Sequence, residues 1–136
     1  MADPLIIKKI DSLSRCIARI EEKRPETIED LERNVDIQDI IAINLERAVQ
    51  QCVDSAMIVL SNAGARVPET MSDAFDQLYT QGVISKEICS RMQNAVGFRN
   101  LIVHAYRKID WKIVWNIITE HLDDFKVFAA EIMRVS

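Results

Sequence analysis

Chain-breaking residues are scarce in this sequence. Three glycines and three prolines are spread over 136 residues, whereas a many-turned β-sandwich or barrel would need more of them. No segment sustains the period-two alternation of apolar and polar residues that is typical of strands. Apolar residues make up 49% of the chain and charged residues 28%, as in an ordinary folded globular domain. The sequence therefore predicts one all-α domain over residues 1–136.

Apolar residues recur every three or four positions in four long segments, which is the spacing of a buried helix face. The second segment runs from about residue 36 to residue 62, and the fourth runs without a break to residue 132. Residues suited to cap a helix N-terminus precede the first, third and fourth segments: Asp3, Ser85 and Asp110. The near-heptad spacing within residues 36–62 is typical of helices that pack almost antiparallel.

Shorter helical elements are expected between the long ones. Thr70 or Ser72 can cap a short helix that ends near Gly82. The acidic connector around Pro25 has room for one short turn at residues 28–33. Four main helices joined by short links indicate an antiparallel four-helix bundle with an additional short helix.

The sequence indicates neither a membrane span nor a disulfide framework. No run approaches the roughly 18 uninterrupted apolar residues that a transmembrane helix needs. Lys8, Lys9 and Asp11 interrupt the first apolar stretch too early for a signal peptide. The three cysteines are widely spaced and form no C-x-x-C pair, which favours free thiols in a reducing compartment over a zinc site. We therefore expect a cytoplasmic protein without a metal or a cofactor.

Charge is distributed unevenly along the chain, whose net charge is −4. Residues 21–39 hold eight acidic side chains against three basic ones, whereas residues 90–109 hold four basic side chains and no acid. A basic patch on an acidic protein can draw a phosphate chain to one place. The candidates for binding such a phosphate chain are Arg91, Arg107 and Lys108. The alternative is a basic helix face that merely offsets the acidic segment within the fold.

Arg99 interrupts the apolar stripe of the helix that follows Ser85. The stripe consists of Ile88, Met92, Ala95 and Ile102. A charged side chain on such a line is expensive to bury without a partner. One interpretation pairs Arg99 with a carboxylate of a neighbouring helix, and the other opens the stripe onto a cleft or a subunit interface. The candidate carboxylates are Asp39, Glu46 and Asp54.

Other polar or small residues lie close to Arg99 in the sequence. His104 follows five positions later, so in an unbroken helix the two side chains would diverge by about 140°. A helix that ended near Val103 would let the histidine turn back beside the arginine. Asn100 adds a neutral donor and acceptor. Gly97, in mid-helix, either lets a backbone or a phosphate approach closely or is simply tolerated there.

The segment from Arg99 to Tyr106 reads Arg-Asn-Leu-Ile-Val-His-Ala-Tyr. It matches the R-x-x-x-x-H-x-Y signature of HEPN-domain toxins, including the asparagine that often follows the arginine in that family. Length and helix order also agree, so the resemblance extends over nearly the whole chain. The sequence resembles the HepT toxins of MNT–HepT toxin–antitoxin systems.

This resemblance implies a metal-independent endoribonuclease that acts on tRNA or mRNA. The residues suit that chemistry because RNA carries its own nucleophile, the 2′-hydroxyl. His104 would transfer the proton. Arg99, supported by Asn100, would hold the scissile phosphate and stabilise charge in the transition state. The products would be a 2′,3′-cyclic phosphate and a 5′-hydroxyl.

The resemblance also implies two partners besides RNA. A two-fold homodimer would bring two Arg99–His104 pairs into one cleft, and an interface would explain an arginine on an apolar stripe. Tyr106 matches the tyrosine that, in HepT-like proteins, receives AMP from the cognate nucleotidyltransferase antitoxin. Attached AMP would add bulk and negative charge at the phosphate site and so repel RNA. From the residues alone, Tyr106 is equally well explained as a packing residue.

The main alternative function is a non-catalytic helical adaptor that binds a nucleotidyltransferase. In an adaptor, the acidic segment 21–39 could dock a basic partner and Arg99 would merely be salt-bridged. The full set of Arg99, His104 and Tyr106 favours the enzyme, since an adaptor has no need for a free imidazole. His121 is the only other histidine, and we expect it to pack or to lie at the surface. A di-iron bundle is excluded because neither histidine has a glutamate three positions before it.

Overall fold

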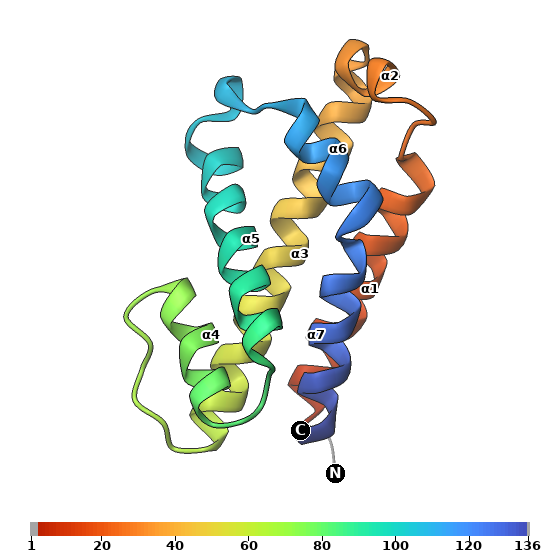
Figure 1. Ribbon diagram of the computed structural model, residues 1–136. Helices are drawn as coiled ribbons and strands as arrows, with labels where there is room; N and C mark the ends of the chain where they lie inside the picture. Colours follow the sequence, from red (N-terminus) through yellow and green to blue (C-terminus); the bar gives the residue numbers. More distant parts are fainter. Residues whose placement is uncertain (1–2, 136) are drawn as a thin grey trace.

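The protein folds as an antiparallel helical bundle in the computed structural model, which describes residues 3–135 (Figure 1). Its elements are α1 (Pro4–Lys23), α2 (Ile28–Arg33), α3 (Val35–Asn62), α4 (Met71–Thr80), α5 (Lys86–His104), a 3₁₀ turn (Tyr106–Lys108), α6 (Trp111–Glu120) and α7 (Leu122–Val135). The long helices α1, α3 and α5 alternate in direction, and α6 with α7 forms the fourth rod. This confirms the predicted all-α bundle, and the described residues contain two short helices, α2 and α4, beside the long ones.

Local sequence signals place the helix starts. A side-chain oxygen accepts a backbone N–H of the first turn at each of the three expected caps: Asp3, Ser85 and Asp110. Thr70 rather than Ser72 caps α4, since its Oγ1 accepts from the N–H of Asp73 at 3.0 Å. The turn expected at 28–33 is the short helix α2. Local capping chemistry thus fixes where α1, α4, α5 and α6 begin.

The apolar stripes of the helices meet in a common core. Helix α1 packs most extensively against α3, and α7 contacts both. Phe75 of α4 and Phe128 of α7 are fully buried and meet edge to face, with ring centroids 5.7 Å apart. The three cysteines are buried free thiols, which confirms that expectation. The core therefore ties the short helix α4 to the last rod of the bundle.

The last rod is not one continuous helix, contrary to the prediction. Helix α6 ends at Glu120 and α7 begins at Leu122, with His121 between them at φ −125°. Two aspartates lie in the first turn of α7, where carboxylates stabilise a helix N-terminus. The apolar stripe continues across the break because Ile118 and Leu122 both remain buried. Periodicity alone could not reveal the break, since these two residues keep their helical spacing.

The C-terminal end of α5 lies at the same end of the bundle as the N-terminal end of α3. Figure 1 shows both at the end opposite the two chain termini, with the 3₁₀ turn above α5. The signature segment 99–106 thereby meets Asp39 near the start of α3 and Gln50 near its middle. None of the helices described between residues 3 and 135 is long and apolar enough to cross a membrane.

Candidate functional site

Arg99 lies between α5 and α3, and its side chain is 16% exposed. Its Nη2 donates to Oε1 of Gln50 at 3.3 Å and lies 3.8 Å from a carboxylate oxygen of Glu46. Its Nη1 donates to Oδ1 of Asn100 at 3.2 Å. Of the three carboxylates that the sequence left open, Glu46 is therefore the partner, while Asp54 pairs with a lysine of α1.

The guanidinium of Arg99 is only partly satisfied. Its Nε is buried without a hydrogen-bond partner, and the separation from Glu46 is too long for a hydrogen bond. A paired, bidentate contact with a carboxylate is the arrangement that satisfies an arginine best. Arg99 is instead positioned mainly by the neutral amides of Gln50 and Asn100. The group therefore keeps the capacity to bind an anion.

His104 is the last residue of α5, and it is exposed. Helix α5 ends at His104, one residue beyond Val103, and the backbone leaves the helical conformation at Ala105, so His104 itself is still part of the helix. Five residues of regular helix set the two side chains about 140° apart around the axis and roughly 7.5 Å apart along it. The polar contacts described for Arg99 do not include His104. Regular helix geometry therefore directs Arg99 and His104 of one chain toward different sides of α5.

Tyr106 opens the 3₁₀ turn after α5 and reaches back to α3. Its hydroxyl donates to Oδ1 of Asp39 at 2.5 Å, and its ring packs edge to face with Trp111, with centroids 6.0 Å apart. Burial raises the pKa of Tyr106 well above its usual range, and the hydrogen bond to Asp39 and the negative charge of Asp39 raise it further. The phenol therefore stays protonated at neutral pH and acts as a donor.

One face of α3 supplies the partners of both Arg99 and Tyr106. Asp39, Glu46 and Gln50 are spaced by seven and four residues, which places them on one side of the helix. A groove of about 270 Å³ lies between this face and the end of α5, bordered by Asp39, Glu46 and Tyr106. Gln50 was not predicted as a site residue. The helical spacing places it on this face of α3, but the sequence does not show that α5 packs against this face.

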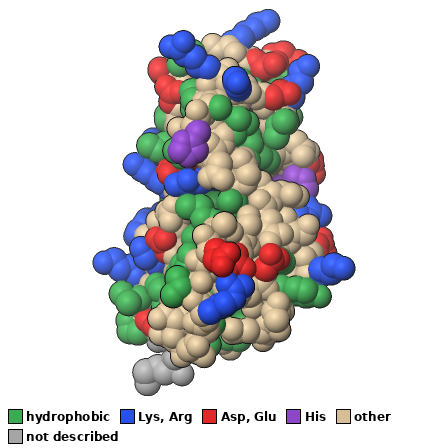
Figure 2. Space-filling view, turned by 90° about the vertical axis from the view of Figure 1, so that its left-hand side faces the viewer, with side chains coloured by type: hydrophobic (Ala, Val, Ile, Leu, Met, Phe, Trp, Pro, Cys, Tyr) green, Lys and Arg blue, Asp and Glu red, His purple; other side chains and the backbone are tan. Residues whose placement is uncertain are grey.

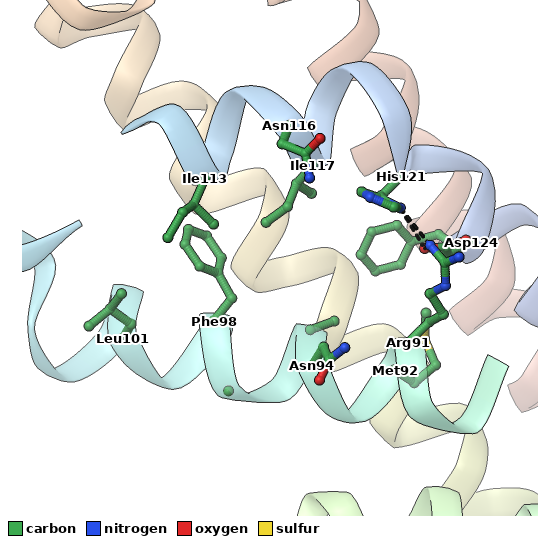
Figure 3. Close-up of a pocket in the computed structure, with 13 residues that line it drawn as sticks. Arg91, Met92, Asn94, Phe98, Leu101, Ile113, Asn116, Ile117, His121 and Asp124 are labelled. Carbon is green, nitrogen blue, oxygen red and sulfur yellow. Dashed lines mark hydrogen bonds and ion pairs between the residues drawn. The ribbon is translucent and has the colours of Figure 1, made fainter. Parts of the chain in front are cut away.

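A second pocket, of about 570 Å³, opens between α5 and the junction of α6 and α7 (Figure 3). Phe98 and Ile113 lie within it, and Arg91 and His121 lie toward one end. The Nη1 of Arg91 is 2.7 Å from Nδ1 of His121 and 3.4 Å from a carboxylate oxygen of Asp124. The predicted RNA-binding residue Arg91 thus links α5 to α7, in a different pocket from Tyr106.

Gly97 lines this second pocket as well. A Cβ atom added to it would meet nothing within 4 Å, so packing inside one chain does not require a glycine at this position. The absence of a side chain leaves the backbone of α5 open toward the pocket.

Arg107 and Lys108 complete the 3₁₀ turn and are exposed. Figure 2 shows Lys and Arg side chains at the upper end of the molecule and the two histidines apart from each other on this face. The turn places positive charge directly after Tyr106. Residues 3–135 contain no group of three or more His, Cys, Asp and Glu side chains that could hold a metal ion.

Comparison with known proteins gives a match over most of the chain. Residues 13–132 match the family described as ribonuclease HepT-like. This chain belongs to the HepT-like family. It is similar to the mRNA nuclease HepT of Shewanella oneidensis, with 29% identity over 124 residues, which cover 91% of this chain and 92% of that protein. The resemblance stated from the signature residues is therefore confirmed.

Solved structures of toxins share the same bundle. A tri-AMPylated HEPN toxin of Shewanella oneidensis, in complex with MNT antitoxin, matches this HepT-like chain with a TM-score of 0.91 at 28% identity, over 96% of this chain and 98% of its own. A toxin–antitoxin structure with AMP-PNP matches with a TM-score of 0.91 at 27% identity, over 96% of this chain and 99% of that one. These matches confirm the HEPN-type fold.

Proposed function

We propose that this HepT-like protein, as a single domain over residues 1–136, is the toxin of a cytoplasmic toxin–antitoxin pair and a metal-independent endoribonuclease. The observation that carries the proposal is the partly satisfied guanidinium of Arg99, held on the helix that also presents an exposed His104. The family description and the name of the Shewanella relative support RNA as the substrate. We propose mRNA or tRNA as the target.

The proposed reaction uses groups that RNA and the toxin already carry. The 2′-oxygen attacks the adjacent phosphorus, and the bond to the 5′-oxygen breaks, which leaves a 2′,3′-cyclic phosphate. His104 removes the proton of the 2′-hydroxyl or donates one to the leaving oxygen. Arg99 binds the phosphate oxygens and stabilises their growing charge, while Asn100 steadies Arg99.

Basic side chains near the site would hold the flanking RNA. Arg107 and Lys108 are exposed beside Tyr106, so their charges are available to phosphates. Arg91 is already engaged by His121 and Asp124. To bind an RNA phosphate, Arg91 would have to exchange these contacts for it.

The proposed active form is a homodimer that shares one cleft. The divergence of Arg99 and His104 on α5 is the reason, since a second protomer can place its His104 opposite the first protomer's Arg99. Val103 beside the groove of Tyr106 and Ile113 beside the pocket of Gly97 are exposed apolar side chains, 45% and 50% accessible. The open backbone at Gly97 also leaves room for a second helix to approach.

Mixed dimers test the shared cleft. Arg99→Ala and His104→Ala subunits would each form an inactive homodimer, and a mixed dimer would contain one complete composite site. We expect mixing to restore up to half of the wild-type specific activity per mixed dimer. Inactive mixed dimers would contradict the shared cleft. So would a protein that is monomeric by light scattering and retains full nuclease activity.

We further propose that a cognate MNT-type nucleotidyltransferase antitoxin neutralises the toxin by transferring AMP to Tyr106. The similar Shewanella toxin is described as tri-AMPylated and bound to MNT antitoxin. The Tyr106 hydroxyl borders an open groove beside Arg99's partner Glu46. An AMP phosphate attached there would compete with RNA for the positive charges of the site.

Cleavage of labelled RNA in the presence of EDTA tests the nuclease. We expect new ends that carry a 2′,3′-cyclic phosphate and a 5′-hydroxyl, with loss of activity in Arg99→Ala and His104→Ala. Arg15→Ala is the matched control, because Arg15 lies on α1 with its side chain 71% exposed. Folding is checked for each variant by circular dichroism. Equal inactivity of wild type and variants, without growth arrest on expression, would support the adaptor instead.

A further inference from the structure

Asp39 accepts a hydrogen bond from Tyr106, the proposed AMP acceptor. It lies on the second turn of α3, and its Oδ1 accepts the hydroxyl proton of Tyr106. Within residues 3–135, no ion pair involving Asp39 is formed, so no cation neutralises its carboxylate. The pair stands at the edge of the groove that also contains Val103 and Glu46. Both the tyrosine oxygen and its acceptor therefore border open space.

We propose that Asp39 is the proton acceptor for the modification of Tyr106, supplied by the toxin itself. The inference rests on the proposed function, in which Tyr106 receives AMP. The carboxylate orients the hydroxyl through the existing hydrogen bond and takes its proton as the new bond forms. The toxin would thus contribute a catalytic residue to its own neutralisation.

The transfer balances in atoms and charge. The Tyr106 oxygen attacks the α-phosphorus of ATP held by the nucleotidyltransferase. The bond between that phosphorus and the bridging oxygen breaks, and pyrophosphate leaves. The hydroxyl proton moves to the Asp39 carboxylate, which later returns it to solvent. No oxidant, reductant or further reactant is required.

A base is needed because the phenol is held in its neutral form. Burial and Asp39 raise the pKa of Tyr106, so unaided phenolate is scarce near neutral pH. A carboxylate is a weak base toward a free phenol, but the proton becomes acidic once the oxygen has begun to bond phosphorus. A catalytic aspartate accepts the substrate hydroxyl proton in the same way in protein kinases.

Three variants of Asp39 and its neighbour separate orientation from proton transfer. Asp39→Asn keeps an oxygen that can accept the hydrogen bond but has little affinity for a proton. Asp39→Glu keeps the carboxylate. Asp36→Asn is the matched control, because Asp36 is exposed one turn earlier on α3 and its loss removes the same charge.

The assay follows AMP transfer to the full-length toxin by the cognate nucleotidyltransferase and ATP, using intact-protein mass spectrometry from neutral to alkaline pH. We expect Asp39→Asn to slow the initial rate by about 100-fold near neutral pH, the scale of a lost general base. The deficit should shrink as pH rises, because hydroxide then forms the phenolate. Asp39→Glu should recover part of the rate, and Asp36→Asn should behave as wild type.

Two results would overturn the inference while leaving the proposed function intact. One is an Asp39→Asn variant that receives AMP on Tyr106 at the wild-type rate. The other is a loss of AMP-transfer rate that has the same size at every pH, which would indicate a structural role alone. Thermal unfolding and RNA cleavage by the same preparations show that the variants are folded. If wild type carries no AMP on Tyr106, the proposed function fails first and the inference falls with it.

Discussion

The Tyr106 hydroxyl meets the Asp39 carboxylate at 2.5 Å, although 67 residues separate the two in the sequence. The contact joins the turn after α5 to the first turns of α3. It holds the phenol as a donor at the edge of the groove and raises its pKa, in addition to the larger effect of burial. The position of the last signature residue therefore depends on α3 as well as on the turn that follows α5.

The ionisation of Tyr106 should respond to Asp39. In a Tyr79→Phe background, which leaves one tyrosine, Asp39→Asn should lower the pH at which the phenolate absorbance appears. The reason is that the substitution removes a negative charge that raises the pKa of Tyr106. The pKa should remain above the usual tyrosine range, since burial is the larger cause. An unchanged ultraviolet titration would show that the contact is not formed in solution.

Tyr106→Phe should separate modification from cleavage. The variant loses the oxygen that would receive AMP but keeps the ring that packs against Trp111. We expect RNA cleavage to remain largely intact and AMP labelling by the nucleotidyltransferase to disappear. Mass spectrometry and a gel assay for cleavage measure the two effects. AMP labelling that persists in this variant would place the acceptor on another residue.

Removal of Arg107 and Lys108 should weaken RNA binding in a salt-dependent way. Both residues are exposed in the 3₁₀ turn, and each lost phosphate contact on single-stranded RNA reduces the slope of log affinity against log salt by about 0.7. Binding of a catalytically inactive toxin at several salt concentrations measures the slope. An unchanged slope in the double alanine variant would exclude these residues from the RNA interface.

Asp73 should make stability depend on acid pH. Its hydrogen bonds with Arg66 and with the N–H of Glu69 lower the pKa of Asp73 to about 2. The stabilisation is therefore complete above the unfolded pKa of about 3.9 and is lost as pH falls through about 2. Thermal unfolding of wild type and Asp73→Asn should differ at neutral pH and converge in acid. Asp11→Asn, which removes an exposed ion pair on α1, should show little difference at any pH.

Phe75 should be the most costly aromatic to truncate in α4. Its ring is fully buried and packs edge to face on Phe128, so Phe75→Ala leaves a cavity between α4 and α7. We expect a loss of about 3–5 kcal/mol in the free energy of unfolding, measured in urea. Val67→Ala, at a position 84% exposed, should change it by less than about 0.5 kcal/mol. A small effect of Phe75→Ala would mean that α4 repacks freely.

Some features of the site followed from local sequence, and others did not. The signature placed Arg99, Asn100 and His104 on one helix, because their spacing is fixed by the helix itself. The sequence offered three carboxylates for Arg99, and only the packing of α5 on α3 selected Glu46 and added Gln50. Helix α5 ends at His104, close to the end near Val103 that was considered from the sequence, but His104 is still helical there and its backbone does not turn back toward Arg99.

The amino-acid sequence by itself determined where the capped helices α1, α5 and α6 begin, which faces the helices bury and which eight residues carry the family signature. Capping, periodicity and spacing are interactions within a few residues of the chain, so they are readable without the fold. Only the tertiary structure decided that Tyr106 binds Asp39, that Arg91 links α5 to α7 through His121 and Asp124, and that the last rod breaks. The contacts of Tyr106 and Arg91 depend on the register of helices distant in sequence, and the break depends on packing that keeps Ile118 and Leu122 buried on both sides of it.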